Sequence, residues 1–280
     1  MLTSTEDRNP ISYDLDLKST REILEIINTE DQKIAYKVKD AMDQIEVLVD
    51  ELINTFANGG RLFYLGAGTS GRLGVLDASE TVPTFSVDPT MVTGLIAGGD
   101  DALRNPIENA EDSKEAAKAD LKKENLTSND FVIGIAASGR TPYSIGAIEY
   151  AREIGAKTGS IACNKNAKIS EYSDYPIEVE TGAEVLSGST RMKAGTATKM
   201  VLNMITTTAM IKIGKVYDNL MVDLKPTNEK LVDRATKIIC EISGYDYESS
   251  KKILSKADNN VKAAIIMATK NVDYEESIKI

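Results

Sequence analysis

The stretch between Gly60 and Glu80 constrains the fold of this chain more than any other. Residues Leu62–Leu65 form a short apolar run with two aromatic side chains, which is typical of a buried strand. Three glycines follow, directly before an apolar helix start: Gly66, Gly68 and Gly71. A strand, a glycine turn and a helix start leave free backbone N–H groups at the positive end of the helix, so the pattern predicts an anion site. Thr69 and Ser70 add two hydroxyl groups to this turn.

Two further polar turns have a similar form. Phe131–Ala136 is a continuous apolar run, as expected of a parallel strand buried on both faces, and Ser138-Gly139-Arg140-Thr141 follows it. Ser189-Thr190 lies in a third polar segment, which opens another helix. A single turn of this kind is more often only a helix cap, but the carboxyl ends of parallel strands share the edge where ligands bind. We therefore expect the turns to converge on one phosphate.

The glycine spacing also matches the dinucleotide-binding fingerprint, which is the main alternative for this turn. A dinucleotide site needs an acidic residue at the end of the second strand, about 20 residues further on. No Asp or Glu ends the predicted strand Met91–Ile96, and Asp100 lies beyond it. The hydroxyl groups of Thr69 and Ser70 suit a compact phosphate, so the sequence favours a phosphate over a dinucleotide.

Strands and helices alternate after residue 60, which predicts an α/β domain with a parallel sheet and helices on both faces. Further strands are expected at Thr158–Cys163 and Pro176–Glu180, and helices at Asp112–Glu124 and Tyr143–Ile154. Helical periodicity returns in three short pieces near the end of the chain: Leu231–Ile242, Tyr247–Leu254 and Val261–Ala268. The predicted segments are residues 1–56, which are helical, residues 57–226, which hold the phosphate site, and residues 227–280, a small helical module.

Two capping boxes predict helix starts in the N-terminal segment. Ser19–Glu22 opens one helix, and Thr29–Gln32 opens a long second helix whose apolar residues run from Ile34 to Phe56.

Composition excludes several classes of function. The net charge of −10 argues against binding to nucleic acid or an anionic membrane surface, and no apolar run is long enough to span a bilayer. The chain has no histidine, so His-based triads and most zinc sites are excluded and no metal is expected. Cys163 and Cys240 imply no disulfide framework, which fits a reducing cytoplasm.

Four blocks together resemble the bacterial N-acetylmuramic acid 6-phosphate etherases, a family with the sugar-isomerase (SIS) fold. They are residues Gly66–Glu80, Asn109–Ser113, Ala136–Pro142 and Ser189–Thr196. Arg8-Asn9-Pro10 and Glu30–Lys33 extend the similarity over nearly the whole chain. The resemblance implies a three-layer SIS domain, a homodimer with its active site near the subunit interface, and a C-terminal module similar to ubiquitin-associated domains.

The resemblance also implies site residues. Glu80 and Glu111 match the two active-site glutamates of the family, whereas Glu111 by itself reads as a solvated residue among other acids. Thr69, Ser70, Ser138 and Thr141 match phosphate-binding positions of the wider fold. The full set of expected substrate-binding residues is Gly68, Thr69, Ser70, Ser138, Gly139, Thr141, Ser189 and Arg191.

The implied reaction removes D-lactate from carbon 3 of the sugar by elimination and then adds water. It needs one acid and one base and no metal or redox cofactor. We expect Glu80 to protonate the departing lactate and activate water, and Glu111 to be the base at carbon 2. Arg191 and Lys193 are either partners of the lactyl carboxylate or helix-end charges.

Two other classes share the fold and the phosphate turns. A sugar-phosphate aldose–ketose isomerase would not need the second glutamate, and an assay for lactate distinguishes it. A non-catalytic phosphosugar sensor would bind its ligand without turnover and would have no reason to keep both Glu80 and Glu111.

Overall fold

The computed structural model describes residues 4–224, 226 and 228–280. Contacts divide the chain into two compact units. The first consists of Met1–Ser79 with Thr90–Ala209 and contains the sheet. The second consists of Glu80–Pro89 with Met210–Ile280 and contains the last four helices.

The first unit is built on five parallel strands in the order β2-β1-β3-β4-β5. Their bounds are β1 Leu62–Gly66, β2 Val92–Ile96, β3 Phe131–Ile135, β4 Lys157–Ala162 and β5 Tyr175–Glu178. The central strands β1 and β3 are buried along their whole length, which explains their uninterrupted apolar sequences. The predicted α/β class, with a parallel sheet flanked by helices, is confirmed.

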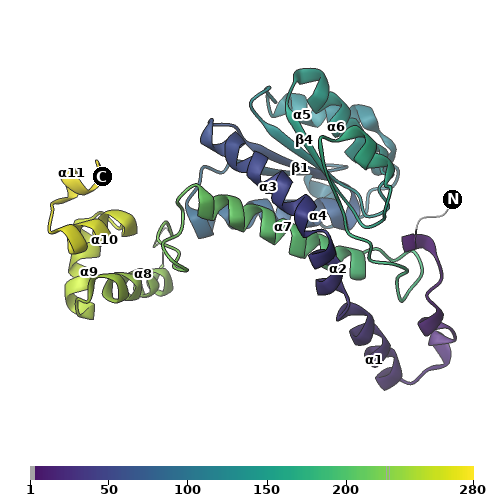
Figure 1. Ribbon diagram of the computed structural model, residues 1–280, viewed down its shortest axis with the longest axis horizontal. Coiled ribbons are helices and arrows are strands. Elements are labelled where there is room, and N and C mark those ends of the chain that lie inside the picture. Colours follow the sequence, from purple (N-terminus) through teal and green to yellow (C-terminus); the bar gives the residue numbers. More distant parts are fainter. Residues whose placement is uncertain (1–3, 225, 227) are drawn as a thin grey trace. The chain divides into compact units, whose positions relative to one another are not determined.

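Helices cover both faces of the sheet, as Figure 1 shows. The helices of this layered arrangement are α3 Met42–Ala57, α4 Gly68–Phe85, α5 Lys114–Lys123, α6 Pro142–Ile154 and α7 Lys193–Lys212. Side chains of β1 alternate between the two faces. Phe63 and Leu65 pack in one core cluster with residues of α5 and α6, whereas Tyr64 is packed against Gly74 of α4.

The N-terminal segment contains three short 3-10 helices and two α-helices before α3. They are Ser4–Glu6, Pro10–Ser12, Leu15–Leu17, α1 Thr20–Asp31 and α2 Ile34–Asp40. The capping box at Ser19 is confirmed by reciprocal bonds with Glu22. The predicted helix start at Thr29 is wrong, because α1 continues through this residue and the next helix begins at Ile34. Gln32, the expected N3 residue of the box, is instead the C-cap of α1, and its side-chain amide donates to Asn28.

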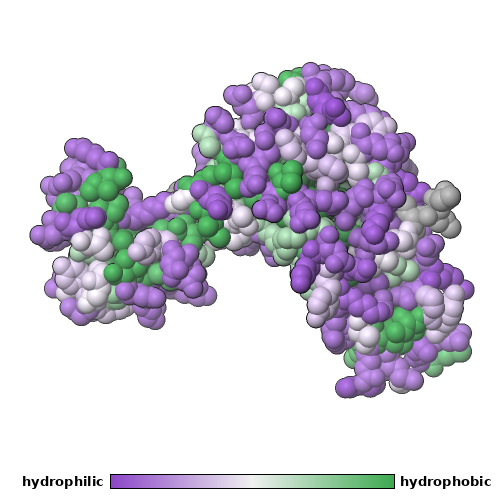
Figure 2. Space-filling model, in the orientation of Figure 1, coloured by the Kyte–Doolittle hydropathy of each residue, from purple (hydrophilic) through white to green (hydrophobic). Residues whose placement is uncertain are grey.

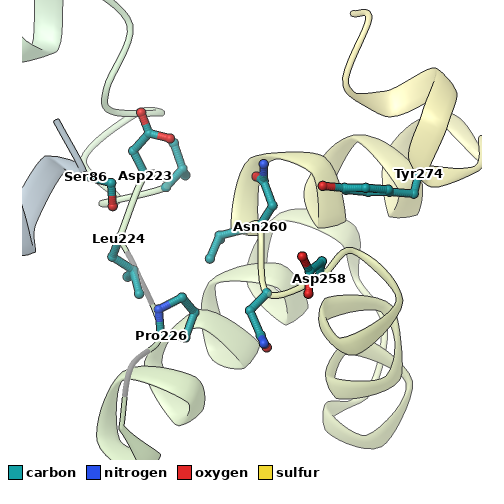
Figure 3. Close-up of a pocket in the computed structure, with 10 residues that line it drawn as sticks. Ser86, Asp223, Leu224, Pro226, Asp258, Asn260 and Tyr274 are labelled. Atoms are coloured by element: carbon teal, nitrogen blue, oxygen red, sulfur yellow. The ribbon is translucent and has the colours of Figure 1, made fainter. Parts of the chain in front are cut away.

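The second unit confirms the helical pieces expected near the end of the chain. They are α8 Glu229–Ser243, α9 Tyr247–Lys256, α10 Val261–Lys270 and the short α11 Tyr274–Ser277. These helices share a core with Val222 and Leu224. A cavity of about 450 Å³ lies within this unit, and Figure 3 shows Asp223 and Leu224 on one side of it and Asn260 and Tyr274 on the other. None of the predicted site residues lines this cavity.

Candidate active site

The turn between β1 and α4 is as tight as its glycines predict. A Cβ atom on Gly71 would lie 2.5 Å from the carbonyl oxygen of Gly66, and Gly68 has a φ of +53°. The long helix α4 begins at Gly68, so its unpaired N–H groups and positive end lie in this turn. Thr69 and Ser70 are partly exposed in the first helical turn. This arrangement is able to bind an anion such as a phosphate.

The turn between β3 and α6 lies beside the first one. β1 and β3 are neighbours in register, with Gly66 opposite Ile135, so both turns leave the same edge of the sheet. The Oγ of Ser138 accepts a hydrogen bond from the N–H of Arg140 at 3.3 Å. Thr141 occupies the N-cap position of α6 but its side chain makes no capping bond. Its hydroxyl group is therefore not used to cap the helix, which is the usual role of a Thr side chain at this position.

The start of α7 contacts the turn between β1 and α4. A Cβ atom on Gly195 would lie 3.5 Å from the Cγ2 of Thr69, so the first turn of α7 contacts the turn after β1. Ser189 is partly exposed and Arg191 is exposed. Lys193 is buried, and its ammonium group is 2.7 Å from Glu30. The charge of Lys193 is therefore paired inside the protein, an arrangement that neither of the two alternatives for this residue included.

Glu111 and the turn between β1 and α4 line the same cavity, which has a volume of about 190 Å³. Glu111 lies in the 3-10 helix Ala110–Asp112, and Gly68 lines the same cavity. Arg72 also lines it and donates hydrogen bonds to the carbonyl oxygens of Ala102 (2.7 Å) and Leu103 (2.9 Å). The sequence analysis missed Arg72, although a cation near the N-terminus of a helix opposes the helix dipole and is a signal for another role.

Glu80 lies elsewhere on α4. It is exposed, belongs to the second unit and follows Gly68 by twelve residues in one helix. At 1.5 Å per residue, this spacing corresponds to about 18 Å along the helix axis. Whether Glu80 reaches a ligand bound in this turn stays a prediction.

Other reactive groups do not form a second centre in the described residues. No set of three or more His, Cys, Asp or Glu side chains there is arranged to hold a metal ion. Burial raises the pKa of the Cys163 thiol to about 12, so this residue is not a nucleophile at neutral pH. No helix among residues 4–224, 226 and 228–280 is long and apolar enough to cross a membrane.

Comparisons with known proteins identify the fold of this chain. Residues 44–152 match the model of the glucokinase regulatory protein N-terminal SIS domain, and residues 108–208 match the SIS domain model. Among solved structures, phosphoheptose isomerase GmhA from Neisseria gonorrhoeae superposes with a TM-score of 0.52 at 13% identity, over 68% of this chain and 98% of that one. A phosphoheptose isomerase from Francisella tularensis has a TM-score of 0.52 at 15% identity, over 68% and 99%. The chain has an SIS fold.

Curated relatives identify one family within the SIS fold. An N-acetylmuramic acid 6-phosphate etherase of Exiguobacterium sp. is 56% identical over 99% of this chain and 94% of its own length. N-acetylmuramic acid 6-phosphate etherase 2 of Enterococcus faecalis is 55% identical, over 98% and 93%. The corresponding protein of Bacillus cereus is 54% identical, over 99% and 94%. The chain belongs to the N-acetylmuramic acid 6-phosphate etherase family.

Proposed function

We propose that the protein is an etherase that converts N-acetylmuramic acid 6-phosphate and water to N-acetylglucosamine 6-phosphate and D-lactate, a step in the recycling of cell-wall amino sugars. The observation that carries this proposal is the 54–56% identity to curated etherases over nearly the whole chain. Two adjacent glycine-containing turns and a carboxylate in a shared cavity support it.

The phosphate is assigned to the turns at the carboxyl edge of the sheet. The positive end of α4 and the hydroxyls of Thr69 and Ser70 receive it, together with Ser138, Gly139 and Thr141 of the neighbouring turn. Ser189 and Arg191, from the segment whose helix contacts Thr69, complete the set. Local N–H groups and hydroxyls are needed here because the chain as a whole carries a net charge of −10.

The carbon–oxygen bond breaks by elimination. In the open-chain sugar, carbon 1 is an aldehyde, so the hydrogen on carbon 2 is acidic. Glu111 takes this proton as the base, the bond between carbon 3 and the lactyl oxygen breaks, and Glu80 protonates that oxygen. Glu80 then removes a proton from water as the water adds to carbon 3, and carbon 2 is reprotonated. Each proton transfer contributes about 10²–10⁴-fold in rate.

The site is completed in a homodimer, near the subunit interface. Both glutamates must reach one sugar, but the helical spacing of about 18 Å keeps Glu80 from the turn of its own chain. We therefore assign Glu80 to the site of the second subunit. Exposed apolar side chains on the N-terminal segment support self-association: Leu17 is 80% exposed and Leu24 58%, and Figure 2 shows apolar surface at the position of α1. The free thiols of Cys163 and Cys240 support a cytoplasmic location.

Hydrogen exchange at carbon 2 in deuterated water tests the assignment. The wild type should release lactate and leave deuterium at carbon 2 of the product. Glu80→Gln should exchange the hydrogen but release no lactate, and Glu111→Gln should do neither. Glu108→Gln, which alters another carboxylate lining the same cavity, is the matched control and should behave as wild type.

Two results would contradict the proposal. Isomerisation of the sugar without release of lactate by the wild type would identify an isomerase. Loss of exchange in Glu80→Gln would show that the roles of the two glutamates are wrongly assigned.

A further inference from the structure

The motifs around Asn9 and Glu30 take no part in the reaction described above, although they belong to the family resemblance. In the structure Asn9 and Lys193, which lies at the start of α7, both bind the carboxylate of Glu30. The Oε2 of Glu30 accepts hydrogen bonds from the Nζ of Lys193 at 2.7 Å and from the Nδ2 of Asn9 at 2.9 Å. Lys33 donates to the other carboxylate oxygen. Three segments distant in sequence therefore meet at one carboxylate.

This ion pair is shielded from water. Glu30 is 4% exposed and Lys193 is 3% exposed. Burial alone raises the pKa of Glu30, but hydrogen bonds from Lys193, Lys33 and Asn9 lower it to about 2, so the carboxylate is ionised at neutral pH. A buried charge that loses its partner is strongly unfavourable, so each group holds the other in place.

The cluster formed by Asn9, Glu30 and Lys193 adjoins a second buried carboxylate, which fixes the first turn of α7. The fully buried Glu184 accepts hydrogen bonds from the N–H groups of Lys193 (3.0 Å) and Ala194 (2.9 Å), two donors that the helix itself leaves unpaired. The Nδ2 of Asn9 also donates to the carbonyl oxygen of Ala183 at 3.2 Å. Asn9 thus joins Glu30 to the segment that caps α7.

Two contacts connect this cluster to the phosphate turns. Gly195, two residues after Lys193, lies against Thr69. The N–H of Gly195 donates to the carbonyl oxygen of Thr190 at 3.0 Å, which links the helix to the segment carrying Ser189 and Arg191. The segment carrying Ser189 and Arg191 also contacts the N-terminal segment directly, because the Oγ of Ser187 donates to the carbonyl oxygen of Glu6 at 3.3 Å.

We propose that Glu30, Asn9 and Lys193 are positioning residues of the phosphosugar site: they lock the N-terminal segment onto the start of α7 and thereby hold Thr69 and residues 187–192 in the geometry that binds the phosphate. This inference rests on the proposed phosphosugar function. It assigns the N-terminal segment to the substrate site and gives Lys193 a role other than contact with substrate.

The test compares Glu30→Gln, Lys193→Met and the double variant with the wild type. Each single variant should weaken binding of N-acetylglucosamine 6-phosphate and raise KM about tenfold, while kcat changes less, because the loss concerns phosphate binding. The double variant should lose less than the product of the two single losses, since it leaves no unpaired buried charge. Amide hydrogen exchange of residues 187–196 should become faster in both single variants.

Asp130→Asn is the matched control. Asp130 is 2% exposed and is paired with Arg61 at 2.8 Å, but it lies just before β3, at the opposite end of the strands. This variant should lower the melting temperature without changing KM or the exchange of residues 187–196. The inference is overturned if Glu30→Gln and Lys193→Met leave KM and that exchange unchanged, or raise KM no more than Asp130→Asn does. A wild type that binds the phosphosugar without releasing lactate would contradict only the proposed reaction, because binding and exchange still test the positioning role.

Discussion

Arg72 anchors the beginning of the loop that leads from β2 to Glu111. Its guanidinium group, near the N-terminus of α4, donates hydrogen bonds to the carbonyl oxygens of Ala102 and Leu103. Arg72→Met should let this loop move and lower kcat by about 10–100-fold, because misplacement of a reacting group by about 1 Å costs that much. Lactate release and carbon 2 exchange should fall together. Arg104→Met, which alters an exposed arginine of the same loop, should have little effect, and an equal loss there would contradict the role of Arg72.

Asp77 couples stability to pH. It is 4% exposed, faces Thr206, and has one carboxylate oxygen without a hydrogen-bond partner in the described part of the chain. Burial raises its pKa above the ordinary value of 3.8. A raised folded-state pKa gives stability that is present below the unfolded-state pKa and is lost as the pH rises through the folded-state value.

Asp77→Asn should therefore be more stable than the wild type at pH 7, by about 1–3 kcal/mol, which is typical for relief of an unsatisfied buried polar group. The advantage should shrink as the pH falls through the folded-state pKa of Asp77, and it should be smallest below about 4, where the carboxyl group is protonated in both states. Thermal unfolding of both proteins from pH 3 to pH 8 measures this difference. A constant difference over the whole range would contradict the titration of Asp77.

At the scale of elements, the turn after β3 depends on a close approach to the segment that follows β4. Gly139 has a φ of +70°, and a Cβ atom there would lie 2.5 Å from the Cβ of Ala167. Gly139→Ala should destabilise the fold by about 1–3 kcal/mol through this clash, in addition to backbone strain, and should weaken phosphosugar binding. Urea unfolding and ligand titration measure the two effects.

Gly182→Ala is the control for backbone strain alone. Gly182 has nearly the same φ, +71°, but an added Cβ atom would have no neighbour within 4 Å. It should lose less stability than Gly139→Ala and keep its affinity for phosphosugar. Equal effects at both positions would show that the packing of Gly139 is unimportant.

At the scale of the whole molecule, the assignment of Glu80 to the second subunit predicts complementation. Glu80→Gln and Glu111→Gln homodimers should each be inactive. After subunit exchange, one of the two sites in each mixed dimer has both wild-type glutamates, so lactate release should reappear at up to about a quarter of the wild-type rate. If both glutamates acted from one chain, no mixed site would be complete and activity would stay absent.

The sequence predicted the elements of this protein well because local patterns determine them. Apolar runs such as Leu62–Leu65 and Phe131–Ala136 are buried on both faces, so their residue types alone indicate parallel strands. The second capping box failed because α1 continues through Thr29, and Gln32 caps the end of that helix and donates to Asn28 instead of to Thr29. The division into residues 1–56, 57–226 and 227–280 and the likeness of the last segment to ubiquitin-associated domains stay predictions.

By itself the sequence determined the fold class, the strands, the glycine turns and the family, since glycine spacing and apolar periodicity depend on neighbouring residues. Only the tertiary structure decided which charged side chains are paired inside the protein and which are exposed to solvent. Lys193 and Arg191 look alike in sequence, yet one is buried against Glu30 and the other is exposed. It also placed Arg72 and Glu111 on one cavity. These distinctions depend on contacts between residues far apart in the chain, which no local pattern encodes.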